Sequence, residues 1–293
     1  MTVESPAGTG SAELARRCEA ALIAYLDRQR PHWPDGTPRG VLDAVRRFVL
    51  ADGKRLRPMF CYWGWRGAGG PDSAAIVTAA AALELFHESG LPIDQIHRGY
   101  RLFTVMRTEV IAGQYLDLVS AVGDGSVAGA LTVIRMKAAR YTVTRPLQIG
   151  AALAGAGPAG QAALQAFGDP LGDAFQLRDD VLGVFGDPAV TGKPVIDDLR
   201  EGKPTVMVAM ARDRASRPQA NRLRELFGSP ALDEAGAAEL RDIITTTGAR
   251  EATEDLIAKR AASARTALTR APLTPQARDA LGELVASVVA RTR

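Results

Sequence analysis

The sequence is poor in the residues that build disulfide scaffolds and sheets. Of 293 residues, two are cysteines and only 5% are aromatic, although 46% are hydrophobic. Cys18 and Cys61 both lie in apolar stretches and lack the close spacing of a metal motif, which favours buried free thiols over a disulfide. Alanine, leucine and arginine recur instead, and this mix suits packed helices better than sheets. We therefore expect an all-α protein.

Long runs of one kind of residue are also absent. The longest apolar run, at 79–83 with its flanks, falls far short of the roughly 18 consecutive apolar residues of a membrane span. The formal net charge is +3 and the basic residues are scattered, so no nucleic-acid partner is expected. Residues 1–10 lack a basic region followed by an apolar one, so they are not a secretory signal. We expect them to be a disordered lead of a cytoplasmic protein.

Apolar residues at helical spacing run through nearly the whole chain. From 11 to about 30, Leu14, Cys18 and Leu22 fall on one helix face. Thr274 and Pro275 are typical of a helix start. No strand pattern, fixed-period repeat or low-complexity linker divides the chain, so we expect 11–293 to form one helical domain. Similar patterns predict further helices over 41–49, 58–67, 73–88, 95–122, 128–153, 161–185, 205–212, 219–227, 233–247, 250–270 and 275–290.

Polar residues interrupt one of these apolar helices near its end. Asp179 and Asp180 come three and four residues after Gln176, which places all three on one side of the helix. Two adjacent carboxylates in an apolar helix are costly unless a cation neutralises them. Mg2+ is the natural candidate, because it is usually held by one or two carboxylates together with substrate phosphates.

The loop after this helix supplies positive charge. Lys193 and Lys203 each follow a glycine, and their flexible ammonium groups are suited to reach a diphosphate. Asp197 and Asp198 are suited to hold outer-shell waters of a metal. An Asp-Asp pair alone is more often a helix end with a solvated acidic loop. The complete arrangement, Gln-x-x-Asp-Asp followed by Gly-Lys-Pro and Gly-Lys-x-Thr, favours a binding site instead.

This arrangement, FQLRDDVLGVFGDP, TGKP and DDLREGKPT over 175–205, resembles the second aspartate-rich region of trans-isoprenyl diphosphate synthases, the polyprenyl synthetases. The resemblance implies a single-domain isoprenoid synthase bundle of helices around a central cavity. It implies that Asp179 and Asp180 hold Mg2+, and that Gln176, Lys193 and Lys203 bind an allylic diphosphate. In the family's reaction that diphosphate ionises, isopentenyl diphosphate attacks the carbocation, and a proton is lost to the departing diphosphate.

The resemblance continues upstream of this region. The turn GKRLRP at 53–58 resembles the family's motif for the diphosphate of isopentenyl diphosphate, which implies that Lys54 and Arg57 contact it. The segment ELFH at 84–87 matches a helix that presents a histidine or glutamine to the same diphosphate, so His87 joins them. Without the resemblance, such a basic turn is more often a solvated helix boundary, and a lone histidine is more often structural.

Two further segments fit the same family. The stretch MRTEV at 106–110 with GQYLD at 113–117 resembles the helix that lines the chain-elongation cavity. Lys137, followed by Tyr141 and Thr142, resembles a Lys-(Thr/Ser)-x-x-Tyr-Thr motif, which implies a catalytic contact between Lys137 and the allylic diphosphate. Ala138 replaces the usual hydroxyl residue, which removes one polar contact but not the charge.

The first aspartate-rich motif of the family, Asp-Asp-x-x-Asp, departs from the pattern here. Its counterpart is DQIHRG at 94–99, in which only Asp94 matches. The alternative alignment, which we favour, has several dozen residues missing between Glu88 and Ser89, including a helix. Either way one carboxylate cluster is in doubt, and ionisation needs metals held from two sides. A missing helix would also expose buried faces that need another cover, such as a dimer partner.

Three functions therefore stay open. The first is a prenyltransferase that condenses isopentenyl diphosphate with an allylic diphosphate, working as a homodimer. The second is a non-catalytic diphosphate-binding subunit that regulates an active relative in a heterodimer, which the weak first motif favours. The third is a lyase or cyclase with a single diphosphate substrate, against which Lys54 and Arg57 argue.

Overall fold

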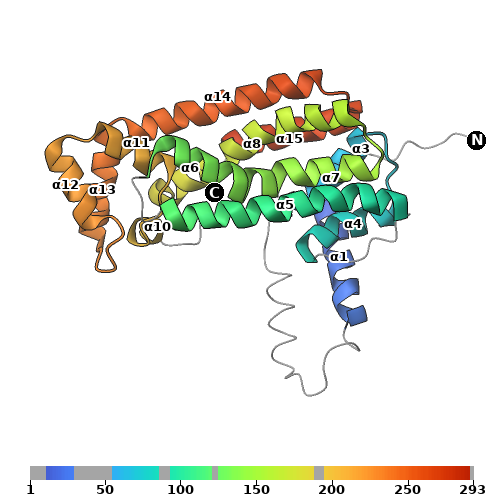
Figure 1. Ribbon diagram of the computed structural model, residues 1–293, viewed down its shortest axis with the longest axis horizontal. Helices are drawn as coiled ribbons and strands as arrows, with labels where there is room; N and C mark the ends of the chain where they lie inside the picture. The colour runs from blue at the N-terminus through green and yellow to red at the C-terminus, as the bar shows by residue number, and fades with distance from the viewer. Residues whose placement is uncertain (1–10, 30–54, 86–92, 121–124, 188–194, 291–293) are drawn as a thin grey trace, which may run out of the picture. The chain divides into compact units, whose positions relative to one another are not determined.

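A computed structural model describes residues 11–29, 55–85, 93–120, 125–187 and 195–290 (Figure 1). Within these ranges the regular structure is helical throughout and contains no strand, which confirms the all-α prediction. None of the helices in these ranges is both long and apolar enough to cross a membrane. Residues 1–10 and the helix expected over 41–49 lie outside the described part.

The chain forms two compact units. The first comprises Met1–Thr104, Thr142–Gln165 and Arg270–Leu281, and the second comprises Val105–Tyr141, Ala166–Thr269 and Gly282–Arg293. The expectation of one domain over 11–293 stays a prediction.

The first unit is built on close packing between two helices. It contains α1 (Ser11–Gln29), α3 (Leu56–Gly67), α4 (Ala74–Leu85) and α7 (Arg145–Leu153), together with the first turns of three longer helices. A Cβ atom on Gly64 of α3 would lie 2.1 Å from the carbonyl oxygen of Leu147, and one on Gly150 of α7 would lie 1.9 Å from that of Cys61. Glycine at both positions therefore allows α3 and α7 to touch backbone to backbone.

The two cysteines lie in this core as free thiols. Cys18 and Cys61 are both fully buried, which confirms the sequence-based prediction. Burial raises the pKa of the Cys61 thiol well above its ordinary value, so this thiol is protonated and unreactive.

The second unit holds most of the predicted site. It contains α6 (Val127–Val133), α10 (Asp197–Arg200), α11 (Val206–Arg214), α12 (Arg217–Leu226), α13 (Glu234–Thr246) and α14 (Ala249–Arg270). It also contains most of α5 (Ile93–Ser120) and of α8 (Pro158–Phe185), and the second half of α15 (Pro275–Ala290). Fully buried Phe167, Leu171 and Leu177 of α8 contribute to its core.

One predicted helix differs from expectation. The segment 128–153 is helical throughout, but residues Ile134–Thr144 wind as a π-helix, η2, between α6 and α7. The α winding resumes at Arg145, and Pro146 lies in the first turn of α7, where the missing amide hydrogen of proline is tolerated. Apolar spacing cannot distinguish the two windings over so few turns, so η2 was not predicted.

The other boundaries agree with the sequence within a few residues. Thr274 caps α15 by accepting a hydrogen bond from the amide of Ala277 at 3.4 Å, as its position before Pro275 predicts. Helix α10 was not predicted, because four residues are too few to display a period.

Candidate active site

One face of α8 carries a row of polar side chains. Asp169, Asp173, Gln176 and Asp180 are spaced by four, three and four residues, so they lie along the same side of the helix. The intervening Leu177 is fully buried. Helix periodicity therefore explains how an apolar helix can present a polar stripe without breaking its packing.

Asp180 lies at the centre of a small polar cluster in the second unit. It is only 3% exposed, and its Oδ1 accepts a hydrogen bond from Nε2 of Gln176 at 3.0 Å. The same oxygen accepts a hydrogen bond from Nζ of Lys203 at 2.9 Å. Nζ of Lys203 also lies 3.3 Å from Oδ2 of Asp198. The structure thus brings together three of the predicted residues, with Asp198 as a second carboxylate.

Burial and charge act in opposite directions within this cluster. Burial raises the pKa of Asp180, and the neighbouring Lys203 ammonium opposes that effect. For Lys203, burial alone would lower the pKa, but the carboxylates of Asp180 and Asp198 raise it above its ordinary value. Lys203 is therefore firmly protonated and supplies a fixed positive charge at this end of α8.

The Gly-Lys-x-Thr pattern has a local structural cause. Gly202 adopts φ +68°, in the left-handed region, and a Cβ there would lie 2.9 Å from Cα of Gly228. Thr205 caps α11 by accepting a hydrogen bond from the amide of Val208 at 3.2 Å. The turn and the cap hold Lys203 between them. Glycine on α8 leaves room for Asp198, because a Cβ on Gly183 would lie 2.3 Å from its Oδ2 and would displace that side chain.

Arg241 of α13 ties both ends of the connection between α8 and α10. Its guanidinium donates to the carbonyl of Val184 at 2.9 Å and to that of Val195 at 3.4 Å. Lys193 belongs to this connection but lies outside the described residues. Asp179 is described and half-buried beside Asp180.

Lys137 projects from η2 toward α5. Its Nζ lies 2.6 Å from Oδ2 of Asp117. Asp117, the last residue of GQYLD, is therefore the counter-ion of Lys137, which is predicted to bind the allylic diphosphate. Because Lys137 and Asp117 are both partly exposed, their ion pair is the kind that an incoming polyanion can exchange.

The predicted ligands of isopentenyl diphosphate belong to the first unit, and only one is described. Arg57 is half-buried in the first turn of α3. It follows Arg55, whose φ of +47° is uncommon for a residue other than glycine and is a local strain typical of functional turns. Lys54 and His87 lie outside the described residues.

Comparison with known proteins decides the family. The family model for polyprenyl synthetases matches residues 93–244, more than half of the chain. The chain belongs to the polyprenyl synthetase family. The match includes the segments that carry Lys137, Asp179, Asp180 and Lys203.

Relatives and solved structures extend this similarity over most of the chain. A geranylfarnesyl diphosphate synthase of Aeropyrum pernix is 29% identical over 310 residues, covering 88% of this chain and 96% of that protein. A short chain isoprenyl diphosphate synthase of Methanothermobacter thermautotrophicus is 32% identical over 270 residues, covering 77% and 82%. A geranylgeranyl pyrophosphate synthase structure from Corynebacterium glutamicum, complexed with isoprenyl diphosphate and magnesium, is 31% identical with a TM-score of 0.87, covering 95% and 99%.

The alignment with the Aeropyrum pernix protein is longer than the part of this chain that it covers. It runs over 310 positions, whereas 88% of this 293-residue chain is about 258 residues. About 50 aligned positions therefore have no counterpart in this member of the family.

The donor set of this polyprenyl synthetase fits magnesium. Within the described ranges no cluster of three or more His, Cys, Asp or Glu side chains forms a ready metal site. Magnesium does not require one, because one or two carboxylates and the substrate's phosphates are its usual protein-bound ligands. Asp180, a buried carboxylate already paired with a cation, and its neighbour Asp179 offer that chemistry.

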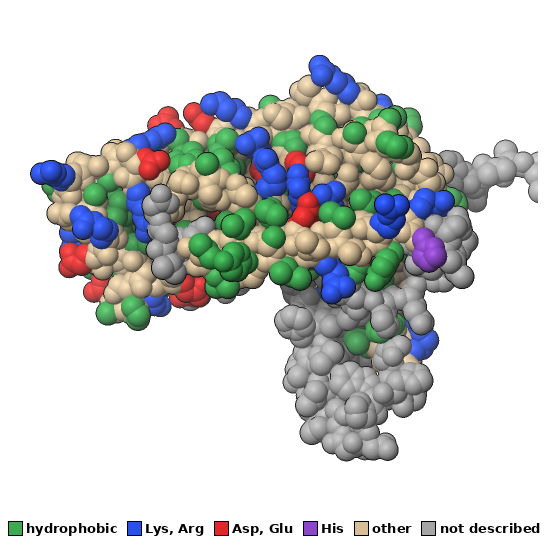
Figure 2. All heavy atoms as spheres, in the orientation of Figure 1, with side chains coloured by type: hydrophobic (Ala, Val, Ile, Leu, Met, Phe, Trp, Pro, Cys, Tyr) green, Lys and Arg blue, Asp and Glu red, His purple; other side chains and the backbone are tan. Residues whose placement is uncertain are grey.

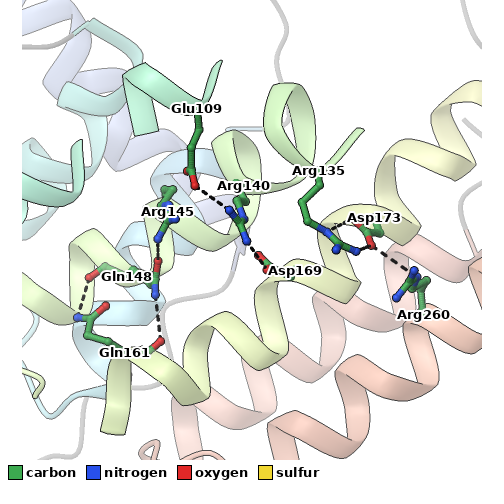
Figure 3. A network of polar contacts seen from close by, with 9 residues as sticks. All are labelled: Glu109, Arg135, Arg140, Arg145, Gln148, Gln161, Asp169, Asp173 and Arg260. Carbon is green, nitrogen blue, oxygen red and sulfur yellow. Dashed lines mark hydrogen bonds and ion pairs between the residues drawn. The ribbon is translucent and has the colours of Figure 1, made fainter. Parts of the chain in front are cut away.

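Sequence reasoning missed two ion networks beside the site (Figure 3). In one, Arg140 bridges Glu109 and Asp169. In the other, Asp173 lies between Arg135 and Arg260. The four-residue spacing of the acids on α8 was available as a signal. Their arginine partners lie 29 to 87 positions away along the chain, so no local pattern pairs them.

Proposed function

We propose that this chain is a prenyltransferase that condenses isopentenyl diphosphate with an allylic diphosphate. The observation that carries the proposal is the cluster of Asp180, Gln176 and Lys203, in which a buried carboxylate and a fixed ammonium lie 2.9 Å apart. Relatives named as geranylfarnesyl and short chain isoprenyl diphosphate synthases support it. So does a similar structure that contains isoprenyl diphosphate and magnesium.

The residues divide between two substrates. Asp179 and Asp180 would hold magnesium, which when bound neutralises the charge that develops on a departing diphosphate. Lys137, Lys193, Lys203 and Gln176 would bind the allylic diphosphate, and Lys54, Arg57 and His87 would bind isopentenyl diphosphate.

Both described lysines are already paired with carboxylates. Lys203 can exchange Asp198 for a diphosphate oxygen, because that contact is its longer one at 3.3 Å. Lys137 can likewise exchange Asp117. Each ammonium stays charged throughout, so the site gains electrostatic stabilisation without having to move a proton.

A second candidate is a non-catalytic subunit that binds an allylic diphosphate and regulates an active relative. Two observations favour it. In one alignment Asp94 is the only residue that matches the first aspartate-rich motif. In the other, which we favour, the motif is deleted, and the about 50 positions of a relative that lack a counterpart here have the size of that deletion. A lyase or cyclase with one diphosphate substrate is the third, and Lys54 and Arg57 argue against it.

Both leading candidates involve a partner chain, and we propose a second copy of this chain. Among the described residues, all the exposed large hydrophobic side chains lie on α5. Within the second unit these are Val105, Ile111, Tyr115, Leu118 and Val119. Figure 2 shows hydrophobic side chains along α5 on the face in view. An apolar face of this kind is typical of an interface. Two copies related by a twofold axis could cover it mutually.

One assay separates the three functions. The purified chain is incubated with magnesium, isopentenyl diphosphate and each allylic diphosphate in turn, and the extracted products are analysed by mass spectrometry. Elongated diphosphates are expected. A product formed without isopentenyl diphosphate would indicate a lyase or cyclase. Absence of any product, combined with magnesium-dependent binding of the allylic diphosphate, would indicate the regulatory subunit.

The site assignment has its own test. Replacing Asp179 and Asp180 together by alanine is expected to abolish magnesium-dependent binding of the allylic diphosphate, measured by calorimetry. Unchanged binding by this variant would show that the ligand lies elsewhere.

A further inference from the structure

The π-helix η2 packs closely against both α5 and α8 in the second unit. A Cβ on Gly113 of α5 would lie 2.5 Å from the backbone nitrogen of Lys137, and one on Gly172 of α8 would lie 2.6 Å from Cα of Ala139. The backbone of η2 therefore approaches both neighbours as closely as glycine permits. Lys137 lies at the point where α5 approaches η2.

The spacing of two arginines matches the unusual winding. Arg135 and Arg140 are five residues apart, and a π-helix, which bonds residue i to i+5, stacks them near one side. An α-helix advances 100° per residue and would place them about 140° apart. Their partners Asp173 and Asp169 are four residues apart on α8, which is one turn of an α-helix. The two ion pairs consequently lie side by side (Figure 3).

Each ion pair belongs to a small, partly buried network. Arg140 donates to Oε1 of Glu109 on α5 at 2.8 Å and to Oδ2 of Asp169 at 3.2 Å. Arg135 donates to Asp173, whose Oδ2 lies 3.5 Å from Nε of Arg260 on α14. The side chain of Asp173 is fully buried. Arg140 thus lies between two acids, and Asp173 lies between two arginines. Replacing Arg140 by an uncharged residue would take a positive charge away from two partly buried carboxylates, which is costly.

We propose that Arg135 and Arg140 are positioning residues that hold η2 in its π winding and thereby aim Lys137. This inference rests on the proposed binding of an allylic diphosphate by Lys137. If η2 rewound as an α-helix, the side chains within it would rotate by tens of degrees relative to α5 and α8. Lys137 would then leave its place beside Asp117.

The face of α8 that binds the two arginines also carries the carboxylate cluster. Asp169 and Asp173 bind the arginines, and Gln176 and Asp180 follow on the next turns of the same stripe. Asp180 lies seven residues beyond Asp173, or about 10 Å along the axis. The ion pairs therefore set the register of Lys137 against Asp180, two groups proposed to act on one diphosphate.

The decisive experiment measures ligand affinity and winding separately. Arg140→Met is titrated with magnesium and an allylic thiolodiphosphate, whose C–S bond resists ionisation. The dissociation constant is expected to rise about tenfold, the scale of lost positioning contacts. Arg140→Lys keeps the charge but cannot engage two carboxylates at once. Its dissociation constant is expected to lie between those of Arg140→Met and the wild type. KM for the allylic substrate should rise while KM for isopentenyl diphosphate stays constant.

The matched control is Glu254→Gln. Arg178 of α8 donates two hydrogen bonds to Glu254 of α14, both 2.7 Å long, at a site that does not involve η2. This variant also removes one charge from an ion pair of α8, and it is expected to lower the melting temperature but to leave the dissociation constant unchanged. Equal weakening of binding by both variants would overturn the proposal, because the arginine would then act through stability alone.

A crystal structure of the Arg135→Met, Arg140→Met variant decides the winding without any ligand. Residues 134–144 are expected to return to i→i+4 hydrogen bonds, and a retained π-helix would overturn the proposal. If the double variant fails to fold, Asp169→Asn removes one pair and is solved instead. A wild-type chain that binds no allylic diphosphate would contradict the proposed function, whereas the winding result would still decide the role of the arginines.

Discussion

Single residues set how closely the charged groups of the site approach. Asp198 reaches Lys203 because it passes over Gly183, where any Cβ would lie 2.3 Å from its Oδ2. Lys203 in turn reaches Asp180 because Gly202 makes a left-handed turn. Gly183 and Gly202 thus allow the side chains of Asp198, Lys203 and Asp180 to form one ion cluster.

Gly183→Ala is expected to weaken magnesium-dependent binding of an allylic diphosphate about tenfold, because it displaces Asp198 and with it Lys203. The measurement is calorimetric titration. Gly160→Ala is the control on the same helix, since its Cβ would meet only the Cβ of Ala156 at 3.5 Å. The control should bind normally. Equal affinities for the two variants would show that Asp198 has no part in the site.

The ion pair between Arg17 and Asp72 should make the stability of the protein depend on pH. Two hydrogen bonds, of 2.7 and 2.9 Å, join them, and these contacts hold the pKa of Asp72 below its ordinary 3.8. A lowered carboxyl pKa contributes stability that is fully present above the unfolded value and is lost as pH falls through the folded one. Because both side chains are about 30% exposed, the contribution is at most about 1 kcal/mol.

Asp72→Asn is therefore expected to lower the free energy of unfolding at pH 7 by up to about 1 kcal/mol. The difference between variant and wild type should shrink as the pH falls below 3.8. Urea unfolding of the variant and the wild type, at pH 7 and at a pH below 3.8, measures this difference. A difference that persists at low pH would mean that the substitution acts by some other route.

At the scale of elements, small residues decide which helices can touch. Helices α3 and α7 meet through Gly64 and Gly150, and η2 fits between α5 and α8 through Gly113 and Gly172. These contacts join backbones directly, so they cannot be relieved by turning a side chain.

Gly64→Ala is expected to destabilise the protein by about 3 kcal/mol or more, because its Cβ would lie 2.1 Å from a backbone oxygen. Thermal or urea unfolding measures the effect. Gly129→Ala on α6 is the control, since its nearest neighbour is the rotatable hydroxyl of Ser126 at 3.2 Å. A loss below 1 kcal/mol for Gly64→Ala would show that α3 and α7 can move apart at little cost.

At the scale of the whole molecule, the exposed face of α5 is the feature that a single chain leaves unexplained. Ile111, Tyr115 and Leu118 recur at spacings of four and three residues and are each more than 60% exposed. Their regular spacing makes one continuous apolar face. A second copy is the partner that we propose for it.

Ile111→Lys with Leu118→Lys is expected to convert a dimer into monomers, because a charge at the centre of an apolar interface is costly to bury. Sedimentation equilibrium measures the mass. Ala262→Lys on α14, also at an exposed helical position, is the control and should leave the mass unchanged. A wild-type chain that is monomeric at all concentrations would contradict the proposed interface.

Much of the site could be read from the sequence because its signals are local. Gln176, Asp179 and Asp180 share a helix side through the period of 3.6 alone, and in the structure Gln176 donates a hydrogen bond to Asp180. The roles of Lys54, His87 and Lys193 stay predictions, as does the binding of magnesium.

Other features depend on contacts between distant segments. The all-α fold, most helix limits and the placement of Gln176, Asp179 and Asp180 on one side of α8 follow from the sequence alone, because periodicity and caps act over a few residues. The pairing of Lys203 with Asp180, the bridge that Arg140 forms between α5 and α8, and the π winding of η2 became visible only in the folded chain. These follow from the packing of helices far apart in the chain, where glycines permit close approach and buried charges require partners.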